Sequence, residues 1–221
     1  MPAEYKATFY STDINRKCRI FSSSMNYDNE EVHYWRDNFT HHCYPPEDQL
    51  QLWPEKPIRY REVVSAYSVE VRELMLRMLD LIGEGLGLKL GYFDGELSKN
   101  QLFNVLFQDF QVLRKGEWMT VEPMPNAFFL LAALQLKVIS NGKFTSPIHR
   151  VITHQKEGRT TIGRFLIPAH DMLIEPANKD DHAADDAPLY RCFTYKEFYS
   201  TFTKNICDAD FALEYFKNKT K

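Results

Sequence analysis

The sequence lacks the features that mark several common classes of protein. It has four cysteines but no C-x-x-C pair, which argues against a zinc knuckle and against a thioredoxin-type redox site. No apolar run is long enough to cross a bilayer, since the longest covers only residues 127–134. Lysine and arginine form no basic stripe, and the net charge is −3. We therefore expect neither nucleic acid nor a membrane as a partner.

What is present is a globular composition. The chain has 221 residues, of which 44% are hydrophobic and 14% aromatic, which is enough for one sizeable core. The first residues, MPAEYKATFYSTD, are polar and contain no signal-peptide core. Together with the scattered cysteines, this pattern predicts a cytoplasmic protein.

The clearest element is an amphipathic helix expected over residues 58–82. Apolar side chains recur there at helical spacing, and charged residues fill the other positions. Gly83, Gly85 and Gly87 are expected to follow the helix and to stop it. The apolar stripe is best interpreted as a core face, although it could also fill a groove on a partner. A second amphipathic helix is predicted for residues 195–215.

From about residue 101 to residue 174, the pattern changes to short alternating runs. Strands are predicted for residues 110–113, 118–121 and 136–139. Turns are predicted at Lys115-Gly116 and at Asn141-Gly142. Several short strands at close spacing indicate an antiparallel sandwich or a jelly roll.

One short segment carries recognisable chemistry. The sequence SPIHRV at positions 146–151 is followed by Arg159, Thr160 and Thr161. An arginine presents a planar fork of donors that matches a carboxylate, and a neighbouring hydroxyl adds another donor. On a strand, residues 159, 161, 163 and 165 share one face. Arg159 and Thr161 could therefore point together into a barrel, where Gly163 leaves room and Phe165 lines the wall.

This segment is similar to the distal half of the site in plant Fe(II)/2-oxoglutarate-dependent dioxygenases. The resemblance implies that His149, in an H-R-V segment, is one of three iron ligands. It also implies that Arg159 and Thr161, at the positions of an R-x-S segment, hold the distal carboxylate of 2-oxoglutarate. The implied cofactors are Fe(II) and 2-oxoglutarate, with ascorbate as an optional addition. The implied partner is a small-molecule substrate.

Other segments that look familial are spread over most of the chain. They cover residues 1–6, 34–37, 53–57, 60–64, 84–88, 116–118, 138–144 and 195–198. Among subfamilies, the pattern resembles hyoscyamine 6-hydroxylase-like and mugineic-acid-type dioxygenases. The fold implied is α+β, mainly β: an incomplete double-stranded β-helix (jelly roll) with a long amphipathic support helix and a C-terminal helix.

The resemblance also predicts how the chain is organised. Residues 1–57 would be a remnant of the family's N-terminal region, irregular with short helices. Residues 58–100 would contain the support helix and a connection, and residues 101–177 a partial jelly-roll core. Residues 178–221 would form an acidic loop and the C-terminal helix.

The sequence departs from the family where the other iron ligands should be. The family carries an N-x-Y-P-P segment and an H-x-D pair between the stretches that match residues 101–105 and 106–113, which are contiguous here. None of the seven histidines is followed two residues later by Asp or Glu. A non-haem Fe(II) oxygenase needs two histidines and one carboxylate on one face of the metal. His149 therefore supplies one ligand of three, and we assign no catalytic residue. The resemblance further implies a chain shortened at its N-terminus.

Other donor groups have simpler interpretations. His170-Asp171 and the acidic residues 180–186 around His182 match no fixed metal spacing, and an acidic loop is usually solvated. His149 is either a weak iron contact or an inherited histidine in a semi-polar pocket. Three histidines near the N-terminus are expected to be packing or surface residues: His33, His41 and His42.

These observations leave three hypotheses. The first is an oxygenase that hydroxylates a small specialised metabolite, whose identity and regiochemistry the sequence does not reveal. The second is a non-catalytic truncated isoform or pseudoenzyme that binds a ligand or partner. In that case the missing strands would expose sheet edges, which favours self-association. The third is an imperfect gene model with no stable protein. The family resemblance favours the first hypothesis, and the ligand count favours the second.

Overall fold

The fold is described from a computed structural model of the chain. The structure describes residues 2–13, 15–23, 27, 31–34, 36–106, 109–152, 161–177, 187–205 and 208–218. The chain divides into two compact units. The first comprises Met1–Phe107 and Thr160–Ala169, and the second comprises Gln108–Arg159 and His170–Lys221. Within the described residues, no helix combines the length and the apolar character that a bilayer crossing requires.

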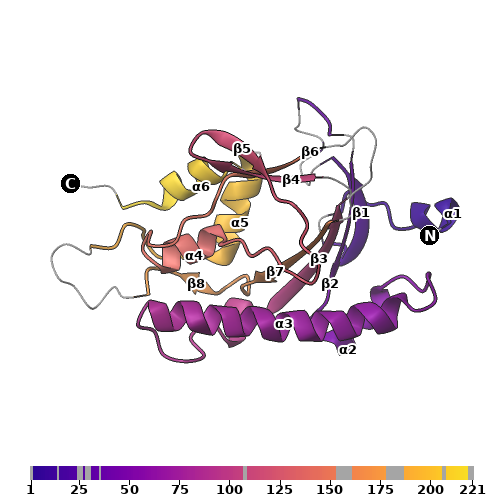
Figure 1. The fold of residues 1–221 in the computed structure, drawn as a ribbon, viewed down its shortest axis with the longest axis horizontal. Helices are drawn as coiled ribbons and strands as arrows, with labels where there is room; N and C mark the ends of the chain where they lie inside the picture. Colours follow the sequence, from indigo (N-terminus) through magenta and orange to yellow (C-terminus); the bar gives the residue numbers. More distant parts are fainter. Residues whose placement is uncertain are drawn as a thin grey trace. The chain divides into compact units, whose positions relative to one another are not determined.

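The first unit is built on a four-stranded antiparallel sheet with the strand order β1-β2-β3-β7 (Figure 1). Its strands are β1 (Cys18–Ser22), β2 (Asp37–His42), β3 (Asn100–Leu106) and β7 (Thr161–Ile167). The prediction that residues 1–57 are irregular is therefore wrong for β1 and β2. Only its short helices are found: α1 (Ala3–Ala7), α2 (Pro46–Gln49) and the 3-10 turn η2 (Leu50–Leu52).

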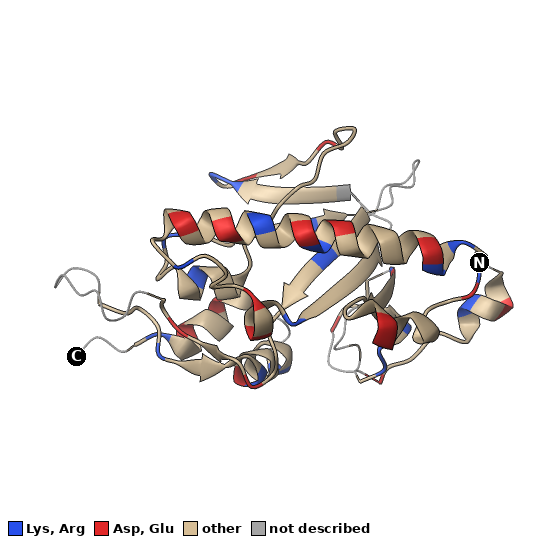
Figure 2. Ribbon diagram, turned by 90° about the horizontal axis from the view of Figure 1, so that it is seen from below, with Lys and Arg blue, Asp and Glu red and all other residues tan. Residues whose placement is uncertain are grey.

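Helix α3 (Tyr60–Gly85) is the predicted amphipathic helix, extended to 26 residues. Figure 2 shows its acidic and basic residues spread along its length, as expected of its solvent face. Only Gly87 of the three glycines stops the helix, because Gly83 and Gly85 lie inside it. Gly87 adopts φ +73°, and the amide of Leu88 donates to the carbonyl of Gly83 at 2.8 Å, which closes a Schellman motif.

The core of the first unit lies where α3 meets the sheet. Cys43, Trp53, Val64 and Phe103 are its buried members. A further 3-10 turn, η3 (Gly95–Ser98), precedes β3. The stripe on α3 is thus a core face in this unit, as the favoured interpretation predicted.

The second unit contains a three-stranded antiparallel sheet with the order β5-β4-β6. Its strands are β4 (Asp109–Arg114), β5 (Glu117–Thr120) and β6 (His149–Ile152). The strands and the turn predicted for residues 110–121 are confirmed. Lys115 and Gly116 have φ values of +51° and +84°, as the type I′ turn of a two-residue hairpin requires.

The strand predicted for residues 136–139 is wrong, because this segment forms helix α4 (Leu134–Ile139). A short apolar run does not distinguish a buried strand from a short buried helix. The Asn141-Gly142 pair ends this helix instead of turning a hairpin. Asn141 adopts φ +51°, and the amide of Gly142 donates to the carbonyl of Lys137 at 2.8 Å.

The helix predicted for residues 195–215 is two helices, α5 (Tyr195–Lys204) and α6 (Ala209–Phe216). Each has its own N-cap, in which Thr194 accepts from the amide of Glu197 and Asp208 accepts from the amide of Phe211. Because a capping side chain satisfies the free amides of a helix start, Asp208 begins a new helix. A two-stranded ladder, β8 (Leu173–Ile174) with β9 (Phe193–Thr194), precedes them. The predicted acidic loop, residues 178–186, lies outside the described residues.

Candidate functional site

His149, the predicted iron ligand, begins strand β6 of the second unit. Its side chain is exposed, and its ring lies 5.4 Å from that of Phe110. Its Nδ1 atom is 3.0 Å from the carbonyl oxygen of Pro147. A proton on Nδ1 would satisfy this carbonyl and leave Nε2 as the free acceptor. Metal-binding histidines commonly use this arrangement, so the geometry of His149 itself is compatible with ligation.

The residues predicted to hold 2-oxoglutarate, Arg159 and Thr161, follow His149 in the sequence. Arg159 is outside the described residues. Thr161 begins strand β7 of the first unit and is half-buried. Phe165 lies on the same strand and is half exposed, and a Cβ atom added at Gly163 would come within 3.1 Å of its ring. The lack of a side chain at Gly163 thus makes room for the Phe165 ring, and the pocket-lining role of Phe165 stays a prediction.

The described residues do not complete an iron site. No group of three or more His, Cys, Asp or Glu side chains among them could hold a metal ion. His182 and the acidic residues around it, which match no fixed metal spacing, lie outside the described part of the chain. His149 alone therefore does not fit the three-ligand requirement of a non-haem iron centre.

A buried polar cluster in the first unit was not predicted from the sequence. At its centre is Arg164 on β7, whose two terminal nitrogens donate to Cys43 Sγ and to Ser68 Oγ, each at 2.8 Å. The guanidinium carbon lies 4.3 Å from the centre of the Phe103 ring and 5.0 Å from that of Tyr67. Since neighbouring residues of a strand point to opposite faces, Arg164 faces away from Thr161, Gly163 and Phe165. The only signal in the sequence that could have indicated this cluster is the alternation of side chains along β7, which puts Arg164 on the face opposite Gly163 and Phe165.

His41 extends this cluster within the sheet. Its ring is fully buried and stacks on Phe103, with ring centres 4.8 Å apart. Its Nε2 lies 2.7 Å from the hydroxyl of Tyr60, and its Nδ1 lies 3.0 Å from the carbonyl of His42. Burial lowers the pKa of His41 to about 3, and the positive charge of Arg164 acts in the same direction. The prediction that His41 is a packing residue is consistent with this environment.

The thiols and hydroxyl near this cluster are not activated. Burial raises the pKa of Cys43 and of Tyr60, and it raises the pKa of Cys18 to about 12. A nucleophilic cysteine needs a lowered pKa and access to solvent. The cluster therefore holds β2, β7 and α3 together and does not form a catalytic dyad.

Replacing Arg164 with lysine is expected to destabilise the protein by about 1–2 kcal/mol, because one ammonium group does not reproduce a planar fork to two acceptors. Urea unfolding followed by circular dichroism measures the change. Arg59→Lys is the matched control, since Arg59 is exposed and only pairs with Glu62 at 2.9 Å on the surface. The control should leave the free energy of unfolding nearly unchanged, because solvent screens an exposed ion pair. Equal losses in both variants would contradict a structural role for the Arg164 fork.

Comparison with known proteins identifies the fold. The family model "2OG-Fe(II) oxygenase superfamily" matches residues 95–168. The crystal structure of JOX2 in complex with 2OG, Fe and JA superposes with a TM-score of 0.82 at 21% identity, over 99% of this chain and 74% of that one. The dioxygenase for auxin oxidation from rice superposes with a TM-score of 0.71 at 17% identity, over 99% and 87%.

Sequence comparison extends over the whole chain. Hyoscyamine 6-dioxygenase of Hyoscyamus niger is 37% identical over 257 residues, which covers 98% of this chain and 74% of the relative. Flavanone 3-dioxygenase 2 of Oryza sativa subsp. japonica is 34% identical over 98% of this chain and 72% of its own length. 2'-deoxymugineic-acid 2'-dioxygenase of Hordeum vulgare is 30% identical over 90% and 67%.

The protein thus has the fold of the 2-oxoglutarate- and Fe(II)-dependent oxygenases. It belongs to the plant Fe(II)/2-oxoglutarate-dependent dioxygenase family, whose members act on small metabolites. The predicted family is therefore confirmed. The predicted fold class, a mainly β jelly-roll type with a support helix and helical C-terminal region, is confirmed as well.

Proposed function

We propose that this chain is a non-catalytic member of the family, one that keeps the oxygenase fold but does not turn over 2-oxoglutarate by the family mechanism. The observation that carries the proposal is the donor set around His149. No H-x-D pair occurs in the sequence, and no second or third metal ligand gathers among the described residues. Iron held by one histidine would not be positioned for the family chemistry.

The connection after β3 supports this proposal. Strand β3 ends at Leu106 and β4 begins at Asp109, so two residues stand where the family would carry its H-x-D segment. The alignment with hyoscyamine 6-dioxygenase runs for 257 positions, more than the 221 residues of the chain, so it contains gaps in this chain. We propose that an internal shortening at this connection is one source of these gaps.

An active oxygenase is the second candidate, and the 37% identity to hyoscyamine 6-dioxygenase favours it. In that case His149 would bind Fe(II), Arg159 and Thr161 would hold 2-oxoglutarate, and Phe165 would line the pocket for a small specialised metabolite. Residues outside the described part of the chain would then have to supply the missing ligands. Ascorbate would be an optional addition.

The test is an anaerobic titration of the purified protein with Fe(II) and 2-oxoglutarate. We expect no visible charge-transfer band, because that band requires 2-oxoglutarate chelated to a held iron. Hyoscyamine 6-dioxygenase from Hyoscyamus niger serves as the positive control. A band in this protein that disappears in His149→Ala would overturn the non-catalytic proposal and establish the second candidate. Circular dichroism of both forms would show that each is folded.

We further propose a cytoplasmic location, supported by Cys18 and Cys43, which are buried free thiols. Self-association through exposed sheet edges also remains a proposal, and light scattering of the purified protein would test it. Strand β7 is the edge to consider, because the backbone of residues 9–11 already pairs with Ile20 of the other edge strand, β1, and unpaired edges favour pairing with another chain.

A further inference from the structure

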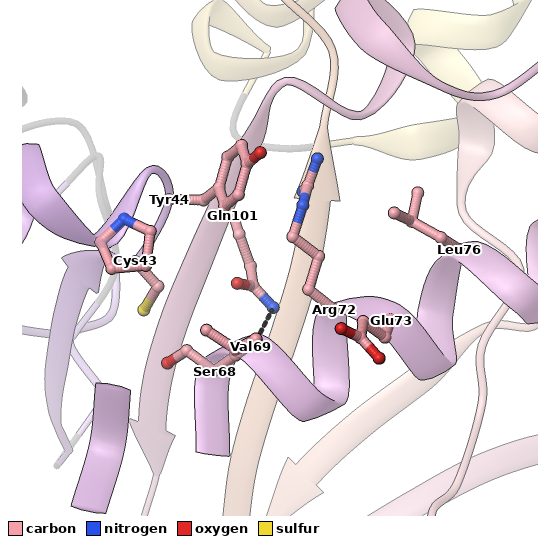
Figure 3. Close-up of a pocket in the computed structure, with 9 residues that line it drawn as sticks. Cys43, Tyr44, Ser68, Val69, Arg72, Glu73, Leu76 and Gln101 are labelled. Carbon is pink, nitrogen blue, oxygen red and sulfur yellow. Dashed lines mark hydrogen bonds between the residues drawn. The ribbon is translucent and has the colours of Figure 1, made fainter. Parts of the chain in front are cut away.

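The first unit contains a pocket of about 240 Å³ between the middle of α3 and the sheet (Figure 3). None of the residues predicted for iron or 2-oxoglutarate lines it. Its lining comes from the segment after β2, from one face of α3 and from the start of β3: Cys43, Tyr44, Pro46, Ser68, Val69, Arg72, Glu73, Leu76 and Gln101. The volume lies just below the range of drug-sized sites, about 300–1,000 Å³, and suits a small metabolite.

Arg72 gives this pocket a buried positive charge. The residue is only 9% exposed, and its guanidinium carbon lies 3.7 Å from the centre of the Tyr44 ring. Its Nη1 atom is buried and has no hydrogen-bond partner among the described residues. Burial also lowers the pKa of Arg72, although Tyr44 and Asp94 oppose the shift. A buried guanidinium with an unused donor is costly unless an anion or another acceptor meets it.

Gln101 supplies the complementary group. It is fully buried on β3, and its Nε2 atom donates to the carbonyl of Ser68 at 3.4 Å (Figure 3). The reverse orientation of the amide would place two acceptors against each other, so this contact assigns the nitrogen to the Ser68 side. The remaining atom, Oε1, is buried without a partner among the described residues. Two residues of the pocket lining thus each have one buried polar atom without a partner among the described residues, a charged donor on Arg72 and an acceptor on Gln101.

The rest of the lining defines the shape of the occupant. Val69, Leu76 and Pro46 are apolar, the Glu73 carboxylate pairs with Arg77 at 3.7 Å, and the Cys43 thiol already accepts a hydrogen bond from Arg164 at 2.8 Å. The pocket therefore offers binding and no free nucleophile. An occupant needs a negative group for Arg72, one donor for Gln101 and a short aliphatic part.

We propose that this pocket binds a small aliphatic hydroxy- or amino-carboxylate. Its carboxylate accepts from Arg72, its hydroxyl or ammonium group donates to Gln101 Oε1, and its aliphatic chain packs on Val69 and Leu76. The site does not depend on iron, so it holds whether the chain is catalytic or not. The proposal thus gives a ligand-binding role to the place where α3 packs on the sheet. None of the residues predicted to bind the cofactors belongs to this site.

The experiment is a calorimetric titration of the full chain with leucic acid, a branched hydroxy acid, in the presence of EDTA so that iron contributes nothing. We expect saturable binding that weakens about tenfold or more in Arg72→Gln, because a charge-assisted hydrogen bond is lost. Arg59→Gln, the same change at the exposed start of α3, should leave the affinity unchanged. Isocaproic acid, which lacks the hydroxyl, should bind about tenfold more weakly because Gln101 gains no donor.

A second variant tests the pocket independently, in case Arg72→Gln does not fold. Val69 is 41% exposed at the pocket, so Val69→Trp fills the pocket while keeping Arg72 and the core. We expect it to abolish binding and to leave the circular dichroism spectrum unchanged. Leucic acid that binds both variants as tightly as the parent protein would overturn the proposal. The absence of binding to the parent protein at about 10 mM ligand, a concentration far above useful affinities, would overturn it as well.

Discussion

Acidification from about pH 7 to about pH 4.5 should destabilise the protein by about 2–3 kcal/mol through His41 alone. In the folded chain, burial holds the pKa of His41 near 3, from an ordinary value of 6.5. Below pH 6.5 the unfolded chain therefore binds a proton that the folded chain does not, and each pH unit costs about 1.4 kcal/mol. The stabilisation is complete above pH 6.5 and is lost progressively as the pH falls toward 3. Urea unfolding at several pH values measures this slope.

The control for this prediction is His41→Phe, which keeps an aromatic ring but does not titrate. The variant should be less stable at neutral pH, because Tyr60 loses its partner and the carbonyl of His42 keeps only the Trp53 indole, but its stability should fall less steeply between pH 6.5 and 4.5. Titration of Asp37 does not account for the loss of stability between pH 6.5 and 4.5. Its hydrogen bonds with Lys6, Tyr10 and Ser22 outweigh its burial and lower its pKa below the ordinary 3.8, so its stabilisation is lost only at lower pH. Equal slopes in parent and variant would contradict the assignment to His41.

Replacing Trp53 with alanine should cost about 3–5 kcal/mol, the usual range for removing a large aromatic side chain from a core. Trp53 is 2% exposed, and its ring centre lies 4.6 Å from that of His41. Its indole nitrogen also donates to the carbonyl of His42 at 2.8 Å. The variant therefore creates a cavity and removes one of the two groups that hydrogen-bond to the carbonyl of His42. Guanidinium unfolding followed by circular dichroism gives the change in the free energy of unfolding.

Trp118→Ala is the matched control, because it removes the same side chain from a site that is 37% exposed on β5. Trp118 lies 4.1 Å from the guanidinium of Arg150, a contact worth about 0.5–1 kcal/mol at such a site. We expect the control to lose about 1 kcal/mol. Comparable losses at both positions would show that the packing around Trp53 does not dominate the stability of its unit.

Several elements were predictable because their signals are local. The spacing of apolar residues in α3 is a property of one continuous segment, and so is the Lys115-Gly116 turn between β4 and β5. The family assignment also came from the sequence, since many short segments together are specific. The roles of His149 and Thr161 rest on the same resemblance and stay predictions, since the described residues contain neither an iron centre nor Arg159.

Other elements depend on residues that are distant in the sequence. Strand β2 pairs with β3, where Phe39 lies opposite Val105, and neither β1 nor β2 has a periodic pattern long enough to stand out alone. Helix α4 was mistaken for a strand because its six residues are too few to show a helical period. A single residue, Asp208, divides the C-terminal helix, and its effect depends on the capping geometry that forms on folding.

The sequence alone determined the family, the support helix, the β4–β5 hairpin and the lack of an H-x-D pair, because each of these is recorded in neighbouring residues. Only the tertiary structure decided that His41 is buried and that Arg164 donates to Cys43 and Ser68. It also decided that Arg72 and Gln101 line one pocket. The physical reason is that burial, pKa and hydrogen-bond partners depend on which distant segments pack together, and a linear pattern does not record this packing.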